Sequence, residues 1–246
     1  MGFVVINVRN IAIWAGISLG LGQPIYAQQV DANPALFAEG VDLYADHCSI
    51  CHGDEGDGNG PLADSFSPPP RDLVNGSFKF RSTGLGEMPT EADLRKTIQN
   101  GIAGSNGRSM PSFYYLSDRE IRALAEVIRV IAGSYEFGTA VIPSQRPTTP
   151  DLVLGKKLYT DLNCAGCHGD EGDGNGVLAP ELLDSNGLLI KPADLRLGQF
   201  KGGNEPKDIW MRVYAGLDGT PMPSFGRNST GDEIWAVVEY VIKFSE

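Results

Sequence analysis

One short phrase occurs twice in this chain of 246 residues, and it restricts the possible folds more than any other feature. The first copy reads HCSICHGDEGDGNG (47–60) and the second NCAGCHGDEGDGNG (163–176), with the last ten residues identical. Each copy holds two cysteines and an adjoining histidine: Cys48, Cys51 and His52, then Cys164, Cys167 and His168. These are all the cysteines of the chain, so no thiol remains for a disulfide or for nucleophilic catalysis.

The similarity between the two halves extends well beyond this phrase, which indicates an internal duplication. PPPRDLVNGSFKF resembles IKPADLRLGQFKG, DLRKTIQNGI matches DIWMRVYAGL, and SMPSF matches PMPSF, all in the same order. We therefore predict one domain over residues 34–134 and a second over 151–246. Residues 135–150 hold three prolines and few large apolar residues, which is typical of a linker.

The sequence predicts an all-α fold for each domain. The last segment of each repeat has apolar residues at helical spacing and starts with a capping box, Ser117 with Glu120 and Thr230 with Glu233. Shorter helices are expected at 91–100 and 206–215, each ended by a glycine, and another before each cysteine pair. A domain of this size with three or so helices and long loops buries little surface by itself. A large apolar group is expected to fill its centre.

The C-x-x-C-H spacing predicts covalent haem attachment. On a helical turn, positions i, i+3 and i+4 share one face, so two thiols can join one side of a haem while the histidine binds its iron. A thioredoxin-like dithiol would need a strand–helix unit, and none is visible. Zinc sites made of two such pairs usually place them about 15–20 residues apart, whereas these pairs lie more than 110 residues apart.

These motifs resemble those of the class I cytochrome c family, and the chain is similar to a tandem, two-haem member of it. The resemblance rests on CSICHG and CAGCHG, on the two MPSF segments, and on the closing helices DREIRALAEVIRVI and DEIWAVVEYVI. It implies two class I cytochrome c domains, each a small helical shell around one covalently attached haem c. It also implies electron transfer, with no catalytic residue and no small-molecule substrate.

The second axial ligand of each iron is expected to be a methionine. The chain has three histidines, and His47, the one outside the C-x-x-C-H motifs, adjoins Cys48 on the attachment side, where it is poorly placed to reach the opposite face. Of the methionines after the first residue, Met110 and Met222 alone occupy matching places, each in MPSF. The family resembled here places its axial methionine in such a loop, so Met110 and Met222 are the predicted ligands. Met88, which also precedes a proline, competes in the first repeat, and Met211 is expected to pack in a core.

The sequence also offers candidates for other roles around the predicted haems. Pro180 in the second repeat, and Pro61 or Pro68 in the first, are candidates to supply the carbonyl that orients the haem-binding histidine. Arg71, Arg81 and Lys201 are expected to be solvated at the surface rather than to contact haem propionates. GDEGDGNG resembles the start of a calcium loop, but Phe66 and Leu182 stand where a bidentate glutamate is required. A tight glycine turn is therefore the preferred interpretation.

The N-terminus and the charge predict where the protein works and what it meets. Residues 1–27 have one charge, Arg9, before an apolar stretch too short to span a bilayer, which is typical of a secretory signal cleaved near Ala27 and of a periplasmic protein. A formal charge of −11 argues against nucleic acid and anionic membranes as partners. It favours redox proteins with a basic docking surface.

We therefore predict a periplasmic carrier of single electrons with two His/Met-ligated haems. Two alternatives stay open: a subunit of a larger oxidoreductase or oxidase complex, and a dihaem sulfur-compound dehydrogenase. The sequence alone does not separate a free carrier from a bound subunit.

Overall fold

A computed structural model of the chain describes residues 34–102 and 110–246. The predicted signal segment therefore lies outside the described residues. The described chain divides into two compact units. Unit 1 holds residues up to Phe78 and from Met88 to Gly138, and unit 2 holds Lys79–Glu87 and Thr139–Glu246. The segment Lys79–Glu87 belongs to the first sequence repeat but packs as part of unit 2.

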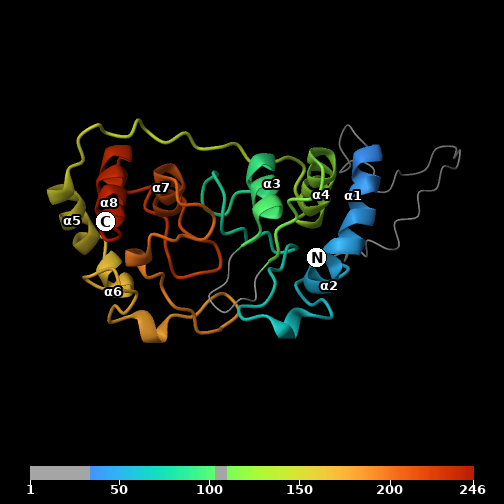
Figure 1. Ribbon diagram of the computed structural model, residues 1–246, viewed down its shortest axis with the longest axis horizontal. Coiled ribbons are helices and arrows are strands. Elements are labelled where there is room, and N and C mark those ends of the chain that lie inside the picture. The colour runs from blue at the N-terminus through green and yellow to red at the C-terminus, as the bar shows by residue number, and fades with distance from the viewer. Residues whose placement is uncertain (1–33, 103–109) are drawn as a thin grey trace, which may run out of the picture. The chain divides into compact units, whose positions relative to one another are not determined.

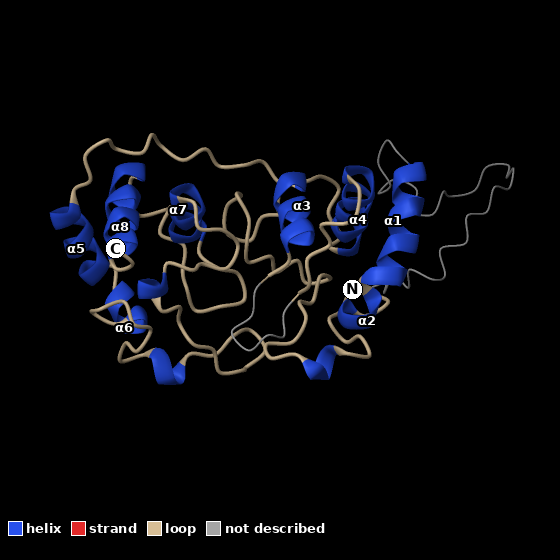
Figure 2. Cartoon of the chain, in the orientation of Figure 1, coloured by secondary structure: helices blue, strands red, loops and turns tan. Residues whose placement is uncertain are grey.

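Within the described residues both units are helical, with no strand beyond one isolated bridge between Leu183 and Leu189 (Figure 2). This confirms the predicted all-α fold. The helices of unit 1 are α1 Pro34–His47, α2 Ser49–His52, η3 Ala63–Ser65, α3 Glu91–Asn100 and α4 Asp118–Ile131 (Figure 1). Those of unit 2 are α5 Leu152–Asp161, α6 Cys164–His168, η4 Ala179–Glu181, η5 Leu195–Leu197, α7 Pro206–Ala215 and α8 Gly231–Lys243.

The helix ends follow the capping signals of the sequence. Ser117 and Thr230 each form the predicted capping box, at the start of α4 and of α8. Gly101 and Gly216 end α3 and α7 with φ of 66° and 70°, a region that favours glycine. A third capping box, which was not predicted from the sequence, joins Thr90 to Asp93 at the start of α3.

Each unit contains an equivalent pair of packed helices. In unit 1, α1 packs on α4, and in unit 2, α5 packs on α8. A glycine lets each pair approach closely: a Cβ added to Gly40 or Gly155 would lie 2.2 Å from the carbonyl oxygen of Ala123 or Ala236. The predicted apolar faces of α4 and α8 form the cores, with Ile121, Leu124, Ile234 and Val238 almost fully buried.

The chain between the two sequence repeats lies on unit 2 for much of its length. The indole Nε1 of Trp235 on α8 donates to the carbonyl of Ser144 at 2.8 Å. The guanidinium of Arg146 forms two hydrogen bonds with the carboxylate of Glu239, which is itself buried. These contacts fix residues 144–146 on α8.

Candidate haem-binding site

Each C-x-x-C-H motif lies on a short helical turn held by the preceding helix. In unit 1 the amide of Cys48 donates to the carbonyl of Tyr44 at 2.9 Å, and the amide of His52 donates to the carbonyl of Cys48 at 2.9 Å. The hydroxyl of Tyr44 in α1 donates to the carbonyl of Gly53 at 2.9 Å, and that of Tyr159 in α5 donates to Gly169 at 2.8 Å. A buried tyrosine therefore fixes the end of both motifs in the same way.

The glycine tail after each histidine turns back onto the motif. A Cβ on Gly60 would lie 2.6 Å from backbone atoms of Ser49, Ile50 and Cys51, and one on Gly176 would lie 2.3 Å from the carbonyl oxygen of Gly166. Because Gly60 and Gly176 have no side chain, the glycine tail can lie directly against the backbone of the motif. Among the described residues no cluster of three or more His, Cys, Asp or Glu side chains is suited to a metal ion.

A backbone carbonyl orients each histidine of the motifs. The Nδ1 atom of His52 lies 2.9 Å from the carbonyl oxygen of Arg71, and that of His168 lies 3.1 Å from the carbonyl oxygen of Ala193. A carbonyl can only accept, so Nδ1 carries the hydrogen and the lone pair of Nε2 is left to bind a metal. Burial lowers the pKa of both imidazoles, and the carbonyl contact partly opposes that shift.

The expectation that Pro61, Pro68 or Pro180 supplies this carbonyl was wrong. The acceptors Arg71 and Ala193 each directly follow a proline, Pro70 and Pro192, in the matched segments PPPRDL and IKPADL. A hydrogen bond two residues later holds each segment in place, because the amides of Leu73 and Leu195 donate to Gly56 and Gly172 at 2.7 Å.

The four thiols are free and half-buried. Burial raises the pKa of Cys48 to about 12 and that of Cys164 to about 11, so both are protonated at neutral pH. Each motif places two half-buried thiols on one helical turn, next to a histidine with a free Nε2. The residues of both motifs therefore fit a haem held through its edge.

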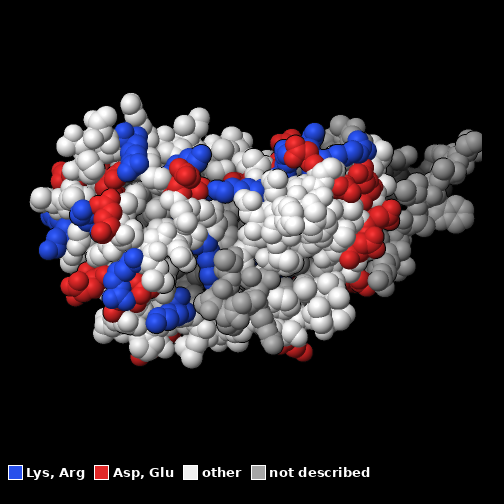
Figure 3. All heavy atoms as spheres, in the orientation of Figure 1, with Lys and Arg blue, Asp and Glu red and all other residues white. Residues whose placement is uncertain are grey.

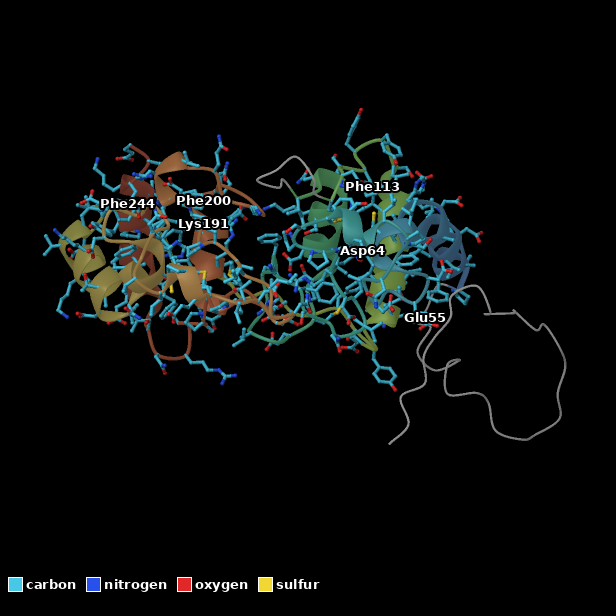
Figure 4. The ribbon with its side chains drawn as sticks, turned by 90° about the horizontal axis from the view of Figure 1, so that it is seen from below. Glu55, Asp64, Phe113, Lys191, Phe200 and Phe244 are labelled. Carbon is cyan, nitrogen blue, oxygen red and sulfur yellow. The ribbon has the colours of Figure 1, made fainter. Side chains whose placement is uncertain are left out.

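The two predicted methionine ligands occupy equivalent loops. The amide of Ile102 donates to the carbonyl of Met110 at 3.0 Å, and the amide of Leu217 donates to that of Met222 at 3.2 Å. In each unit the phenylalanine of MPSF donates its amide to the preceding helix, Phe113 to Ile98 and Phe225 to Val213, both at 3.1 Å. Both methionines are half-buried and pack against the core of their unit. Figure 4 labels Phe113 near the first of these loops.

The remaining methionines and His47 have other surroundings. Met211 is buried in the core of unit 2, which confirms its expected packing role. Met88 packs against the core of unit 1, as Met110 does. The ring of His47 makes an edge contact with Phe113, 6.0 Å between centroids.

Arg81 differs from its expectation. We predicted that this side chain is solvated at the surface, but none of it is exposed, and it pairs with Asp218. Both residues belong to unit 2.

Comparison with known proteins matches each repeat to a cytochrome model. Residues 35–128 match the model described as cytochrome C oxidase, cbb3-type, subunit III, and residues 152–244 match the model described as cytochrome c. Within the described residues no helix combines the length and the apolar character needed to cross a membrane.

Curated relatives and a solved structure extend this similarity. The Cbb3-type cytochrome c oxidase subunit FixP of Azorhizobium caulinodans is 26% identical over 87% of this chain and 63% of its own length. The chain thus spans less than two thirds of that relative. The cytochrome subunit of sulfide dehydrogenase of Chlorobaculum tepidum is 26% identical over 48% of this chain and 91% of its own length.

A solved structure is matched over almost its whole length. A chain of the Kuenenia stuttgartiensis reducing HAO-like protein complex Kustc0457/Kustc0458 is 37% identical, with a TM-score of 0.76 over 85% of this chain and 96% of that one. With a cytochrome match in each repeat and a C-x-x-C-H motif in each match, the chain belongs to the cytochrome c family and carries two of its domains in tandem, which support two covalently attached haem c groups.

Proposed function

We propose that this protein transfers single electrons between redox proteins through two His/Met-ligated haems. Cys48 and Cys51 would hold the first haem and Cys164 and Cys167 the second. His52 and Met110 would be the iron ligands of the first haem, and His168 and Met222 those of the second. Haem held in this way supplies reversible one-electron chemistry, and a soft thioether ligand favours the reduced iron.

One observation carries this proposal: both units repeat the same set of contacts around the motif. In each, a buried tyrosine fixes the glycine after the histidine, and a carbonyl takes the Nδ1 hydrogen. In each, the MPSF loop closes by the same hydrogen bond. Duplicated positioning of a histidine and a methionine suits two coordinatively saturated irons, which have no position for a substrate. The protein is then an electron carrier and not itself an enzyme.

A spectrum of the oxidised protein tests this function. We expect a far-red sulfur-to-iron charge-transfer band from both haems and no response to cyanide at low concentration, because both axial positions are filled. A high-spin signal, or rapid cyanide binding at one haem, would instead indicate an open iron and an enzymatic role such as dehydrogenation of a sulfur compound.

We further propose that the chain works as the electron-transfer subunit of a larger oxidoreductase complex. The structural match over 96% of a chain from a reducing HAO-like complex supports this assignment, as does the similarity to oxidase and dehydrogenase subunits. The formal charge of −11 favours a basic docking surface on the partner. Acidic side chains gather over α1 in Figure 3. This helix carries the exposed Asp42 and Asp46.

Size-exclusion chromatography of the native protein from its own cells separates a subunit from a free carrier. We expect the chain to elute with a larger haem protein at low salt and to dissociate as salt screens the charged interface. Elution as an isolated chain at every salt concentration would favour a free periplasmic carrier. The same material tests export, because a cleaved signal leaves Gln28 as the first residue.

A further inference from the structure

A segment of the first repeat is built into unit 2. Phe78-Lys79 matches Phe200-Lys201 and Asp93 matches Asp208, but thirteen residues lie between Lys79 and Asp93, against six between Lys201 and Asp208. The first repeat is therefore longer here, in a stretch that includes Lys79–Glu87, the segment that packs with unit 2. We call Lys79–Glu87 the strap.

The strap is held in unit 2 by backbone and side-chain contacts. The amide of Val141 donates to the carbonyl of Ser82 at 2.6 Å. The ring of Phe80 packs on Gly202, where an added Cβ would lie 2.4 Å from a ring carbon. Thr83 is fully buried. These contacts give the strap a defined position in unit 2.

Arg81 is the third of the nine residues of the strap, and its side chain is fully buried. Its two terminal nitrogens reach both oxygens of the Asp218 carboxylate, at 2.6 and 3.0 Å. Its Nε donates to the carbonyl of Gly84 at 2.8 Å. A paired, two-point contact of this kind fixes direction as well as distance.

Asp218 lies in the loop that ends at Met222, and this loop is closed on itself. The amide of Leu217 donates to the carbonyl of Met222, and the amide and hydroxyl of Thr220 donate to the carbonyl of Leu217 at 3.0 and 2.8 Å. The amide of Met222 donates to the hydroxyl of Thr220 at 3.2 Å. Fixing Asp218 therefore fixes the backbone that carries the Met222 side chain.

We propose that Arg81 is a positioning residue for Met222, so that the axial ligation of the second haem depends on a residue of the first repeat. The inference rests on the proposed role of Met222 as an iron ligand. Removing the guanidinium leaves the carboxylate of Asp218, with 10% of its side chain exposed, without its partner. A buried unpaired charge is strongly unfavourable, so the loop must move to hydrate it. Such movement takes the sulfur of Met222 away from the position in which it is proposed to bind the iron.

The test uses the full chain and begins with Met222→Ala, which identifies the share of the far-red band and the reduction potential that belong to the second haem. Arg81→Met should then weaken that same share of the band and lower that same potential, and leave the first haem unchanged. It should also speed hydrogen exchange at the amides of Leu217 and Met222 by about tenfold or more, because local opening of the loop becomes easier. Arg81→Lys, which keeps the charge but not the two-point contact, should fall between the wild type and Arg81→Met.

Arg146→Met is the matched control. It removes another two-point contact to a buried carboxylate in unit 2, that of Glu239 on α8. It should leave the far-red band intact. Equal weakening of the band by Arg146→Met would overturn the proposal, because general destabilisation of unit 2 would then explain the effect.

The other outcomes are also decisive. If Met222→Ala removes half of the band but the Arg81 variants change neither band nor exchange, the positioning role is wrong while the proposed function stands. If Met222→Ala leaves the band intact, the ligand assignment fails and the inference fails with it. If Arg81→Met yields no folded protein, Arg81→Lys decides by the same two measurements.

Discussion

A chain in which Cys164 and Cys167 are both replaced by serine is expected to carry one haem instead of two. The two thiols lie on a single helical turn, α6, and serine forms no thioether with haem. The intact mass should fall by one haem, and the absorbance per chain by about half, if each C-x-x-C-H motif holds one haem. The matching change at Cys48 and Cys51 should remove the other haem.

Ala165→Ser is the control for this change, since Ala165 lies between the two cysteines and is itself no candidate ligand. It should keep both haems. If the double serine variant also kept both haems, the second motif would not be the attachment site.

The second large effect is expected at the methionines. Met110→Ala and Met222→Ala should each remove about half of the far-red band and lower the potential of one haem by roughly 0.1 V or more, given that axial ligands set haem potentials over about 0.8 V. The physical reason is that a soft, neutral thioether stabilises the reduced iron, and alanine supplies no ligand. Redox titration followed at the haem absorbance measures both potentials.

Met88→Ala is the control in unit 1, because Met88 also packs against the core and precedes a proline. It should leave the band unchanged. If it removes the band while Met110→Ala does not, Met88 is the ligand of the first haem and the equivalence of the two MPSF loops does not extend to their chemistry.

The helical framework could be predicted from local signals. Capping boxes set the starts of α4 and α8, and glycines set the ends of α3 and α7, because each acts on backbone groups within three or four residues of itself. The duplication then paired Met110 with Met222, and the structure places both in loops closed by the same hydrogen bond. Local periodicity and an internal repeat were sufficient to predict these helices and the two matching methionine loops.

Two features of the site escaped prediction for different physical reasons. The acceptors of the histidine hydrogens are backbone carbonyls, of Arg71 and Ala193, and a carbonyl is offered by every residue. No side-chain pattern marks these two carbonyls, and the prediction therefore named prolines instead of the residues that accept the hydrogen bonds.

The pairing of Arg81 with Asp218 joins residues 137 positions apart. Arginine is mostly exposed in proteins, and nothing in the neighbouring sequence names a partner for Arg81, so solvation was predicted. The extra length of the first repeat at the strap can be seen in the sequence, but it does not identify Asp218 as the partner of Arg81.

The mass of the mature wild-type protein tests the central claim most directly. The account predicts the polypeptide plus two haems, retained under denaturing conditions because thioether bonds survive unfolding. A mature protein without colour, or one whose denatured mass equals that of the polypeptide alone, would contradict the account at its foundation.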